Sequence, residues 1–350
     1  MTNPEPLTLT PRLARIFARG RAFLGAEIPI MCGAMTWISE ADLVSLMSNL
    51  GAFGSLAAGN MPPDLFAAEV RKTQELTAQP FAANLITIAP NYRAHLDILC
   101  EAGLSHIVFA GSIPRRSEVE QAKRSGAKVL CFASNPSIAR RMVDYGADAL
   151  ILEGSEAGGH IGHVSTVVLL QDVLFEFADE VPIFVAGGIA HGGMIGHLGL
   201  MGAAGAQLGT RFVVAEECKA HPRFKNVFIK ARAREAVATP QYSSKLPVVA
   251  VRALQNAAME EFGRLQLRLL RQLEAGEITR QEAQYAVEHY WVGSLREGAV
   301  AGDVERGSLM AGQSVGLVSK IQPLREILKD LIDAADHAVA RVERLLPGRG

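Results

Sequence analysis

Residues 153–162 bring together, in one short stretch, the residue types that an active site needs. Two carboxylates, Glu153 and Glu156, are followed by Gly158 and Gly159 and then by His160. A histidine titrates near neutral pH, so it can exchange a proton with a bound substrate. The glycines give the backbone room to turn the imidazole toward a ligand. A lone histidine is more often structural, but this setting makes His160 the candidate catalytic residue.

Two later segments repeat the design of an apolar run that ends at glycine. One run ends at Gly187 and Gly188, and the other ends at Gly209 and Thr210. Glycine at a strand end lets backbone amides approach a phosphate, and the N-terminus of a following helix adds a favourable dipole. Each glycine alone could form an ordinary tight turn. Three such strand ends in series predict one shared ligand site.

Eight apolar runs of strand length recur along the chain, and amphipathic helical patterns fill most gaps between them. Strands flanked in this way are covered on both faces and should be parallel. This alternation of strands and helices predicts an α/β fold, a closed (β/α)8 TIM barrel rather than an open sheet. The late glycines then follow the seventh and eighth strands, where such barrels usually bind phosphate. The expected strands are 28–31, 51–56, 81–86, 106–110, 128–132, 149–152, 182–186 and 206–208, and the clearest helices are 40–49, 63–77, 92–102, 117–125, 136–145 and 193–201.

The pattern changes after the eighth strand. Residues 217–303 are rich in Arg, Glu, Gln and Ala and predict helices with no strand between them. We expect a barrel formed by residues 16–216 and 304–346, with 217–303 as a helical insertion or lid beside its mouth. The longest helices expected in this half of the chain are 251–275, 279–290 and 323–346.

Composition narrows the classes of partner. The formal net charge is -1 with 20% charged residues, and both signs are interspersed, which argues against nucleic acid and anionic lipid as partners. No apolar run reaches the length of a membrane helix, and residues 1–10 lack the pattern of a secretory signal. We therefore expect a cytoplasmic protein. Four scattered cysteines without ligand spacing predict reduced thiols and no metal site.

Several segments resemble the nitronate monooxygenase superfamily, the 2-nitropropane dioxygenase-like FMN barrels. Within it, the chain is most similar to the enoyl-acyl-carrier-protein reductase II branch, and the likeness extends over about residues 16–331. The resemblance implies FMN at the C-terminal mouth of the barrel, NADH or NADPH as co-substrate, and a catalytic histidine at His160. The segments that carry it are 28–37, 153–160, 186–189, 205–212 and 302–313.

The resemblance also implies which residues contact FMN. Amides around the late glycines and the Thr210 hydroxyl would hold the phosphate, Asn84 would meet the pyrimidine edge, and Glu153 would bind a ribityl hydroxyl or an ordered cation. Relatives often have glutamine and glycine where this chain has Cys32 and Ala34. The implied cofactor set is Gly33, Ala34, Met35, Asn84, Glu153, Gly158, Gly159, Ala186, Gly187, Gly188, Gln207, Gly209, Thr210, Met310, Ala311, Gly312 and Gln313.

The activity that the resemblance implies is NAD(P)H-dependent reduction of an enoyl thioester through reduced flavin. The partner would be a small-molecule or acyl-carrier thioester, and the protein would form a homodimer. Two alternatives share the scaffold: a nitronate monooxygenase that oxidises alkyl nitronates with O2, and an NAD(P)H:quinone reductase. A flavin-binding protein without turnover would leave His160 without a role. No Rossmann glycine motif is present, so the nicotinamide should dock over the flavin.

Five side chains near these motifs have less specific interpretations. Glu156 could orient the candidate histidine or begin a helix, and Trp37 could stack beside a ligand or pack as an ordinary aromatic. His163 is expected to be a solvated neighbour. His191 and His221 are expected to act only as helix caps.

Overall fold

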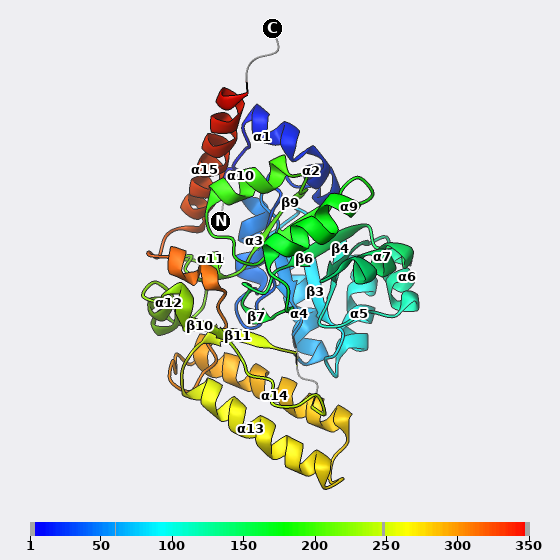
Figure 1. The fold of residues 1–350 in the computed structure, drawn as a ribbon. Coiled ribbons are helices and arrows are strands. Elements are labelled where there is room, and N and C mark those ends of the chain that lie inside the picture. The colour runs from blue at the N-terminus through cyan, green and yellow to red at the C-terminus, as the bar shows by residue number, and fades with distance from the viewer. Residues whose placement is uncertain (1–3, 60, 247–248, 347–350) are drawn as a thin grey trace.

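Eight parallel strands form the TIM barrel that the sequence predicts (Figure 1). The computed structural model describes residues 4–59, 61–246 and 249–346. The strand order is β1-β9-β8-β6-β5-β4-β3-β2. Seven strands lie within two residues of their expected ends; β2 begins four residues late. The strands are β1 Ile30–Cys32, β2 Ser55–Ala57, β3 Ala82–Ile86, β4 His106–Ala110, β5 Lys128–Ala133, β6 Ala149–Glu153, β8 Ile183–Ala186 and β9 Gly205–Leu208.

The ring closes through Phe53, just before β2. Its N–H donates to the carbonyl oxygen of Ile30 (3.0 Å), and its own carbonyl accepts from the N–H of Cys32 (2.8 Å). Closure matters because an open edge would leave a row of strand N–H and C=O groups unpaired. The inside of the barrel is filled by apolar side chains, among them Met31, Val108 and Phe184.

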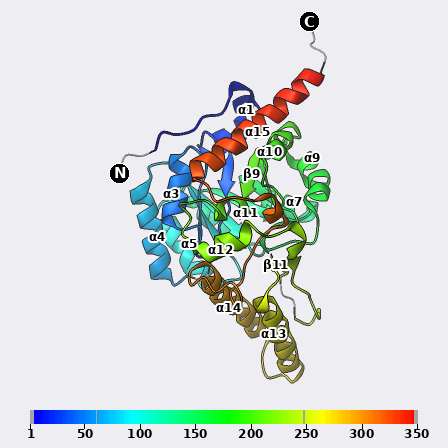
Figure 2. The same cartoon turned by 90° about the vertical axis from the view of Figure 1, so that its left-hand side faces the viewer.

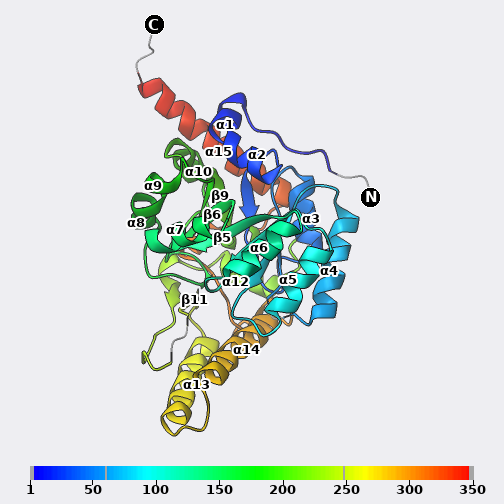
Figure 3. The same cartoon turned by 90° about the vertical axis from the view of Figure 1, so that its right-hand side faces the viewer.

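The helices surround the barrel in the order that a (β/α)8 fold requires (Figure 3). Every helix expected within the barrel is present to within one residue at each end. Figure 2 shows the last helix, α15, lying across α10 at the end away from the insertion. The helices of this part are α1 Pro11–Ile16, α2 Ala18–Leu24, α3 Ala41–Asn49, α4 Pro63–Leu76, α5 Tyr92–Glu101, α6 Arg116–Arg124, α7 Pro136–Asp144, α8 Thr166–Leu169, α9 Phe175–Phe177, α10 Gly192–Leu200, α11 Thr210–Val213 and α15 Leu324–Leu345.

Residues 217–303 contain strands, so the expectation of helices alone is wrong. Strands β10 (Ala236–Ala238) and β11 (Val251–Leu254) pair antiparallel, and β11 also pairs with β7 (Gly159–His160). The expected helix 251–275 therefore begins late: α13 is Ala257–Glu274. The side chain of Asn256 caps it by accepting from the Met259 N–H.

Two long helices then project from the barrel as a hairpin (Figure 1). Helix α14, Arg280–Ala299, runs nine residues beyond its expected end, and α12, Pro222–Phe228, precedes the strands. The hairpin has a hydrophobic cluster of its own that includes Phe262, Leu269 and Trp291. None of the helices in the described part of the chain has the length and hydropathy needed to cross a lipid bilayer.

Candidate active site

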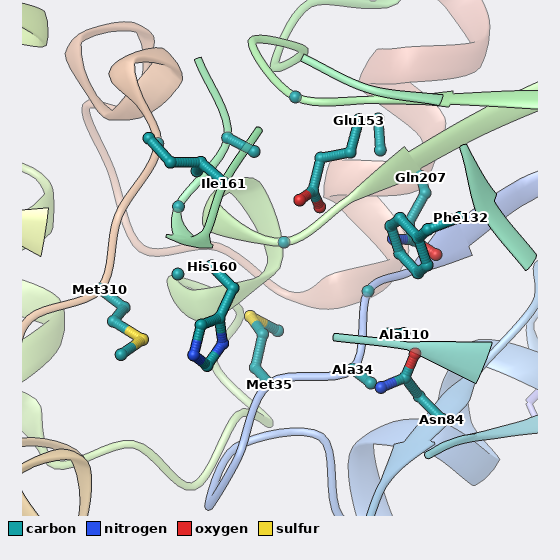
Figure 4. A pocket seen from close by; sticks show the side chains of 18 of the residues that line it. Ala34, Met35, Asn84, Ala110, Phe132, Glu153, His160, Ile161, Gln207 and Met310 are labelled. Carbon is teal, nitrogen blue, oxygen red and sulfur yellow. The ribbon is translucent and has the colours of Figure 1, made fainter. Parts of the chain in front are cut away.

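A cavity of about 560 Å³ lies at the C-terminal ends of the barrel strands, and helix α14 forms part of its wall (Figure 4). Most of the expected site residues line it. Two do not: Ala311 is fully buried in the core, and the Gln313 N–H donates to the Glu156 carbonyl oxygen (2.9 Å). Those that line it are Gly33, Ala34, Met35, Asn84, Glu153, Gly158, Gly159, His160, Ala186, Gly187, Gly188, Gln207, Gly209, Thr210, Met310 and Gly312.

Unpaired backbone amides gather where the seventh and eighth barrel strands end. The N–H groups of Gly187, Gly188, Gly209 and Thr210 have no acceptor among the described residues. Gly187 and Gly188 both have positive φ, 88° and 72°, a backbone conformation that favours glycine. A Cβ at Gly187 would lie 2.9 Å from the Gly154 carbonyl oxygen. Amides that are free and unobstructed in this way suit a phosphate.

The loop after β1 presents small residues and peptide groups to the cavity. The Ser39 hydroxyl donates to the Gly33 carbonyl oxygen (2.8 Å) and accepts from the Met35 N–H (3.0 Å), which fixes the path of the loop. Figure 4 shows Ala34 and the amide side chains of Asn84 and Gln207 on the same side of the cavity. Amides that can donate and accept beside a flat backbone surface suit a polar heteroaromatic ring.

Glu153 ends β6 with its carboxyl group directed into the cavity (Figure 4). The side chain has no hydrogen-bond partner among the described residues, and burial raises its pKa to about 8. Desolvation disfavours the charged form of a carboxyl group. At neutral pH, Glu153 is therefore mainly protonated and can donate a hydrogen bond to a hydroxyl or carbonyl of a bound ligand.

The raised pKa of Glu153 makes stability depend on pH. Between about 4.5 and about 8, the folded state holds a proton that the unfolded state releases, so the free energy of unfolding falls as the pH rises through this window. Glu153→Gln cannot ionise, so it does not lose stability in this window. In flavin-free protein, the difference between its unfolding midpoint and that of the parent should therefore increase as the pH approaches 8. Thermal unfolding at several pH values checks this. The same change at exposed Glu305 should leave the curves parallel; parallel curves for Glu153→Gln would refute the assignment.

His160 lies on β7 at the mouth of the cavity and meets a carboxylate from the insertion. Its Nε2 is 3.3 Å from Oε1 of Glu288 on α14. The side chain of His160 is 24% exposed and that of Glu288 only 6%. Sequence reasoning missed Glu288, because it is one of several acidic residues on a long helix, 128 positions from its partner.

The structure decides between the open interpretations of neighbouring side chains. Glu156 does not orient His160: it lies in a turn, and its carboxylate accepts from the N–H and the hydroxyl of Thr166, the first residue of helix α8, each at 3.0 Å. The capping roles of His191 and His221 are confirmed, since the Nδ1 atoms accept from backbone N–H groups two residues on. His163 is exposed, as expected.

Trp37 is not part of the cavity wall and instead connects the loop after β1 to helix α14. Its indole N–H donates to the Val292 carbonyl oxygen (3.2 Å), and the Arg296 guanidinium lies 5.9 Å from its ring centre. Among the described non-glycine residues, Trp37 alone has a positive φ, 64°. Such strain persists where surrounding contacts hold it, often at functional sites.

Trp37→Phe should loosen this connection. Loss of the indole hydrogen bond is expected to lower the free energy of unfolding by about 1 kcal/mol and to speed hydrogen exchange in α14. Urea unfolding and exchange measured by mass spectrometry check the two effects. Tyr285→Phe, on an exposed part of the same helix, serves as control and should change stability by less than about 0.5 kcal/mol. Equal exchange in both variants would rule out the connecting role.

The charges around the cavity are acidic. No lysine or arginine is among the described residues that line it. Glu153 and Glu288 are the lining carboxylic acids, and His160 is the only lining histidine. An anionic group in this space therefore depends on backbone amides and on His160.

Comparison with known proteins agrees with this architecture. The model of the nitronate monooxygenase family matches residues 19–92 and 86–334. A Mycobacterium tuberculosis protein named (3aS,4S,5R,7aS)-5-hydroxy-7a-methyl-1-oxo-octahydro-1H-indene-4-carboxyl-CoA dehydrogenase is 28% identical over 342 residues, covering 90% of this chain and 95% of its own length. A probable nitronate monooxygenase from Bacillus subtilis is 26% identical, and the match covers 84% of this chain and 92% of the relative.

Solved structures give the same result. FabK from Thermotoga maritima superposes with a TM-score of 0.81 at 31% identity, covering 94% of this chain and 99% of FabK. A nitroalkane oxidase from Streptomyces ansochromogenes superposes with a TM-score of 0.76 at 25% identity, covering 92% of this chain and 99% of the oxidase.

Proposed function

Since this chain belongs to the nitronate monooxygenase family, whose members are oxidoreductases and flavoproteins, we propose that it is an FMN-dependent reductase of enoyl thioesters. NADH or NADPH would serve as the electron donor. FabK, an enoyl-acyl-carrier-protein reductase II, supports the reaction type. The Mycobacterium tuberculosis relative, named as a carboxyl-CoA dehydrogenase, supports a thioester as the substrate class.

The observation that carries this proposal is the absence of a cationic side chain among the described residues that line the cavity. An alkyl nitronate is an anion, and a buried anion is costly unless a cation or hydrogen-bond donors offset it. The reacting end of an enoyl thioester is neutral. A space in which Glu288 lies beside His160 and no lysine or arginine is among the described lining residues therefore suits the thioester better.

The residues fit FMN at three points. The amides of Gly187, Gly188, Gly209 and Thr210 would bind the phosphate, with the loop after β1 under the ring and the Asn84 and Gln207 amides at its edge. Protonated Glu153 would donate to a ribityl hydroxyl. When bound and reduced by NADH or NADPH, FMN would supply a hydride for the β-carbon of the substrate.

The chain itself supplies the proton and the surroundings. His160 would hold a proton at the cavity mouth and deliver it to the α-carbon of the thioester, so that hydride and proton together saturate the double bond. Apolar side chains from four parts of the fold would exclude water and accept the acyl chain. These are Ile113, Ile138, Ile161, Val292 and Leu295.

Nitronate monooxygenase activity is the second candidate, because the family model and the Bacillus subtilis relative both carry that name. In that reaction, His160 would act as a base that removes the proton from a neutral nitroalkane. The same residue would thus serve either reaction, and the negative charge of an alkyl nitronate is what distinguishes that substrate from the neutral enoyl thioester.

Steady-state assays decide between the two. The purified protein loaded with FMN is given an enoyl-CoA with NADH or NADPH, and separately an alkyl nitronate with O2. The proposal expects kcat/KM for the thioester to exceed that for the nitronate by at least a factor of about 100. The reverse order would assign the chain to the nitronate monooxygenases.

We further propose that residues 217–303 act as a lid on a barrel formed by residues 16–216 and 304–346. Helix α14 of this segment contributes Glu288, Trp291, Val292 and Leu295 to the cavity wall. A homodimer, an acyl-carrier or CoA thioester as partner, and a cytoplasmic location complete the proposal.

A further inference from the structure

A carboxylate from the insertion faces the proposed proton donor. Glu288 lies on α14, and its Oε1 is 3.3 Å from Nε2 of His160. This distance is long for a strong hydrogen bond, as is common at catalytic pairs before substrate binds. His160 belongs to β7, which pairs with β11 of the insertion in the register Val251 to His160. Two contacts therefore join this histidine to the insertion.

The burial of Glu288 limits the states that the pair can adopt. Its side chain is 6% exposed, and His160 is its only side-chain partner among the described residues. A buried carboxylate is costly unless it is paired. Ionised Glu288 therefore favours the forms of His160 in which Nε2 carries a proton.

The other ring nitrogen is then left for chemistry. Nδ1 of His160 has no hydrogen-bond partner among the described residues, and the side chain lines the cavity. A carboxylate at one nitrogen of an imidazole sets its tautomer and stabilises its protonated form. We propose that Glu288 is a positioning residue that keeps a proton on Nε2, so that Nδ1 is the atom that exchanges a proton with the substrate. This inference rests on the proposed function, because it assigns the atom that performs that proton transfer.

Few other charged groups surround this pair. Glu153 on β6 is the other acid of the cavity. The guanidinium of Arg252, on β11 beside Gly159, donates to the carbonyl oxygens of Ser155 and Ala236 and is not part of the cavity lining. His289, the neighbour of Glu288, is exposed. Glu288 is therefore the charged group best placed to orient the His160 ring.

Glu288→Gln keeps the shape of the side chain and removes its charge. The neutral amide can donate as well as accept, so it no longer selects the tautomer with the proton on Nε2. We therefore expect kcat to fall by about one to three orders of magnitude, whereas KM should change little because Glu288 acts through His160. Glu288→Asp restores the carboxylate and should return kcat toward that of the parent.

Glu297→Gln is the matched control, since Glu297 is exposed on the same helix; its kcat should equal that of the parent. If Glu288→Gln is less stable but keeps the parental kcat, Glu288 only docks the insertion, and the inference is overturned.

The tautomer can be measured without turnover. Nitrogen-15 NMR of histidine-labelled, FMN-loaded protein reports which ring nitrogen carries the proton, and the His160→Asn variant identifies the His160 signals among those of nine histidines. We expect neutral His160 to carry its proton on Nε2 in the parent and to lose this preference in Glu288→Gln. A proton on Nδ1 in the parent would overturn the inference. Failure of the proposed function is distinct: it would show as no reduction of the enoyl thioester by the FMN-loaded parent, whatever the tautomer of His160.

Discussion

His160→Ala should lower kcat for the enoyl thioester by about two to four orders of magnitude, because general acid catalysis contributes an effect of about that size. The variant should still fold and bind FMN. His160 lies at the cavity mouth, whereas the unpaired amides lie at the ends of β8 and β9. Turnover, thermal unfolding and flavin stoichiometry, measured on the same preparation, separate a loss of chemistry from a loss of cofactor.

His163→Ala is the control for this experiment. His163 is exposed three residues away, so its loss should change kcat by less than about twofold. Unchanged steady-state rates for His160→Ala with every accepted substrate would show that proton transfer by this histidine is not part of the mechanism.

Gly209→Val should abolish stable FMN binding in a protein that still folds. Gly209 has a φ of -111°, which any residue adopts, and a Cβ there would meet only Met35, at 3.5 Å from its sulfur. The added side chain would lie among the unpaired amides and keep a phosphate away from them. Loss of two charge-assisted hydrogen bonds corresponds to about 3 to 6 kcal/mol, or about two to four orders of magnitude in affinity. Gel filtration followed by flavin absorbance checks this.

Gly187→Val should lose FMN as well, but together with stability, because its Cβ would approach Gly154 and its φ is 88°. Gly126→Val measures the cost of a positive φ without a steric clash: Gly126 has a φ of 89°, and no atom lies within 4 Å of an added Cβ. That control should be destabilised yet bind FMN fully. Stoichiometric FMN on Gly209→Val after gel filtration would refute the phosphate position.

The barrel could be predicted from local sequence because parallel strands covered on both faces are continuous apolar runs. β2 is the exception in position, since the apolar residues before it close the ring through Phe53 instead of extending the strand. Strands β10 and β11 are no shorter than several barrel strands, so their length is not the reason that they could not be predicted. Their antiparallel pairing depends on distant partners: Arg252 of β11 lies opposite Gly159.

Some residues of the site could likewise be predicted from the sequence, and others could not. Glycine and amide positions at strand ends could be found because the topology gathers strand ends at one mouth. Glu288 could not, since neighbouring residues on α14 give no sign that this carboxylate meets His160. The role of Glu156 could not be predicted either, because its carboxylate contacts the start of α8 through Thr166, ten residues further along the chain.

Anaerobic reduction of the bound flavin tests the central claim most directly. The purified protein is loaded with FMN and mixed without oxygen with NADH or with NADPH while the visible flavin band is followed. The proposed function predicts that one nucleotide bleaches the band rapidly and that an enoyl thioester then restores it. A band that neither nucleotide bleaches, but that an alkyl nitronate does, would contradict the reductase assignment, and a protein that stays colourless after addition of FMN would contradict a flavin site altogether.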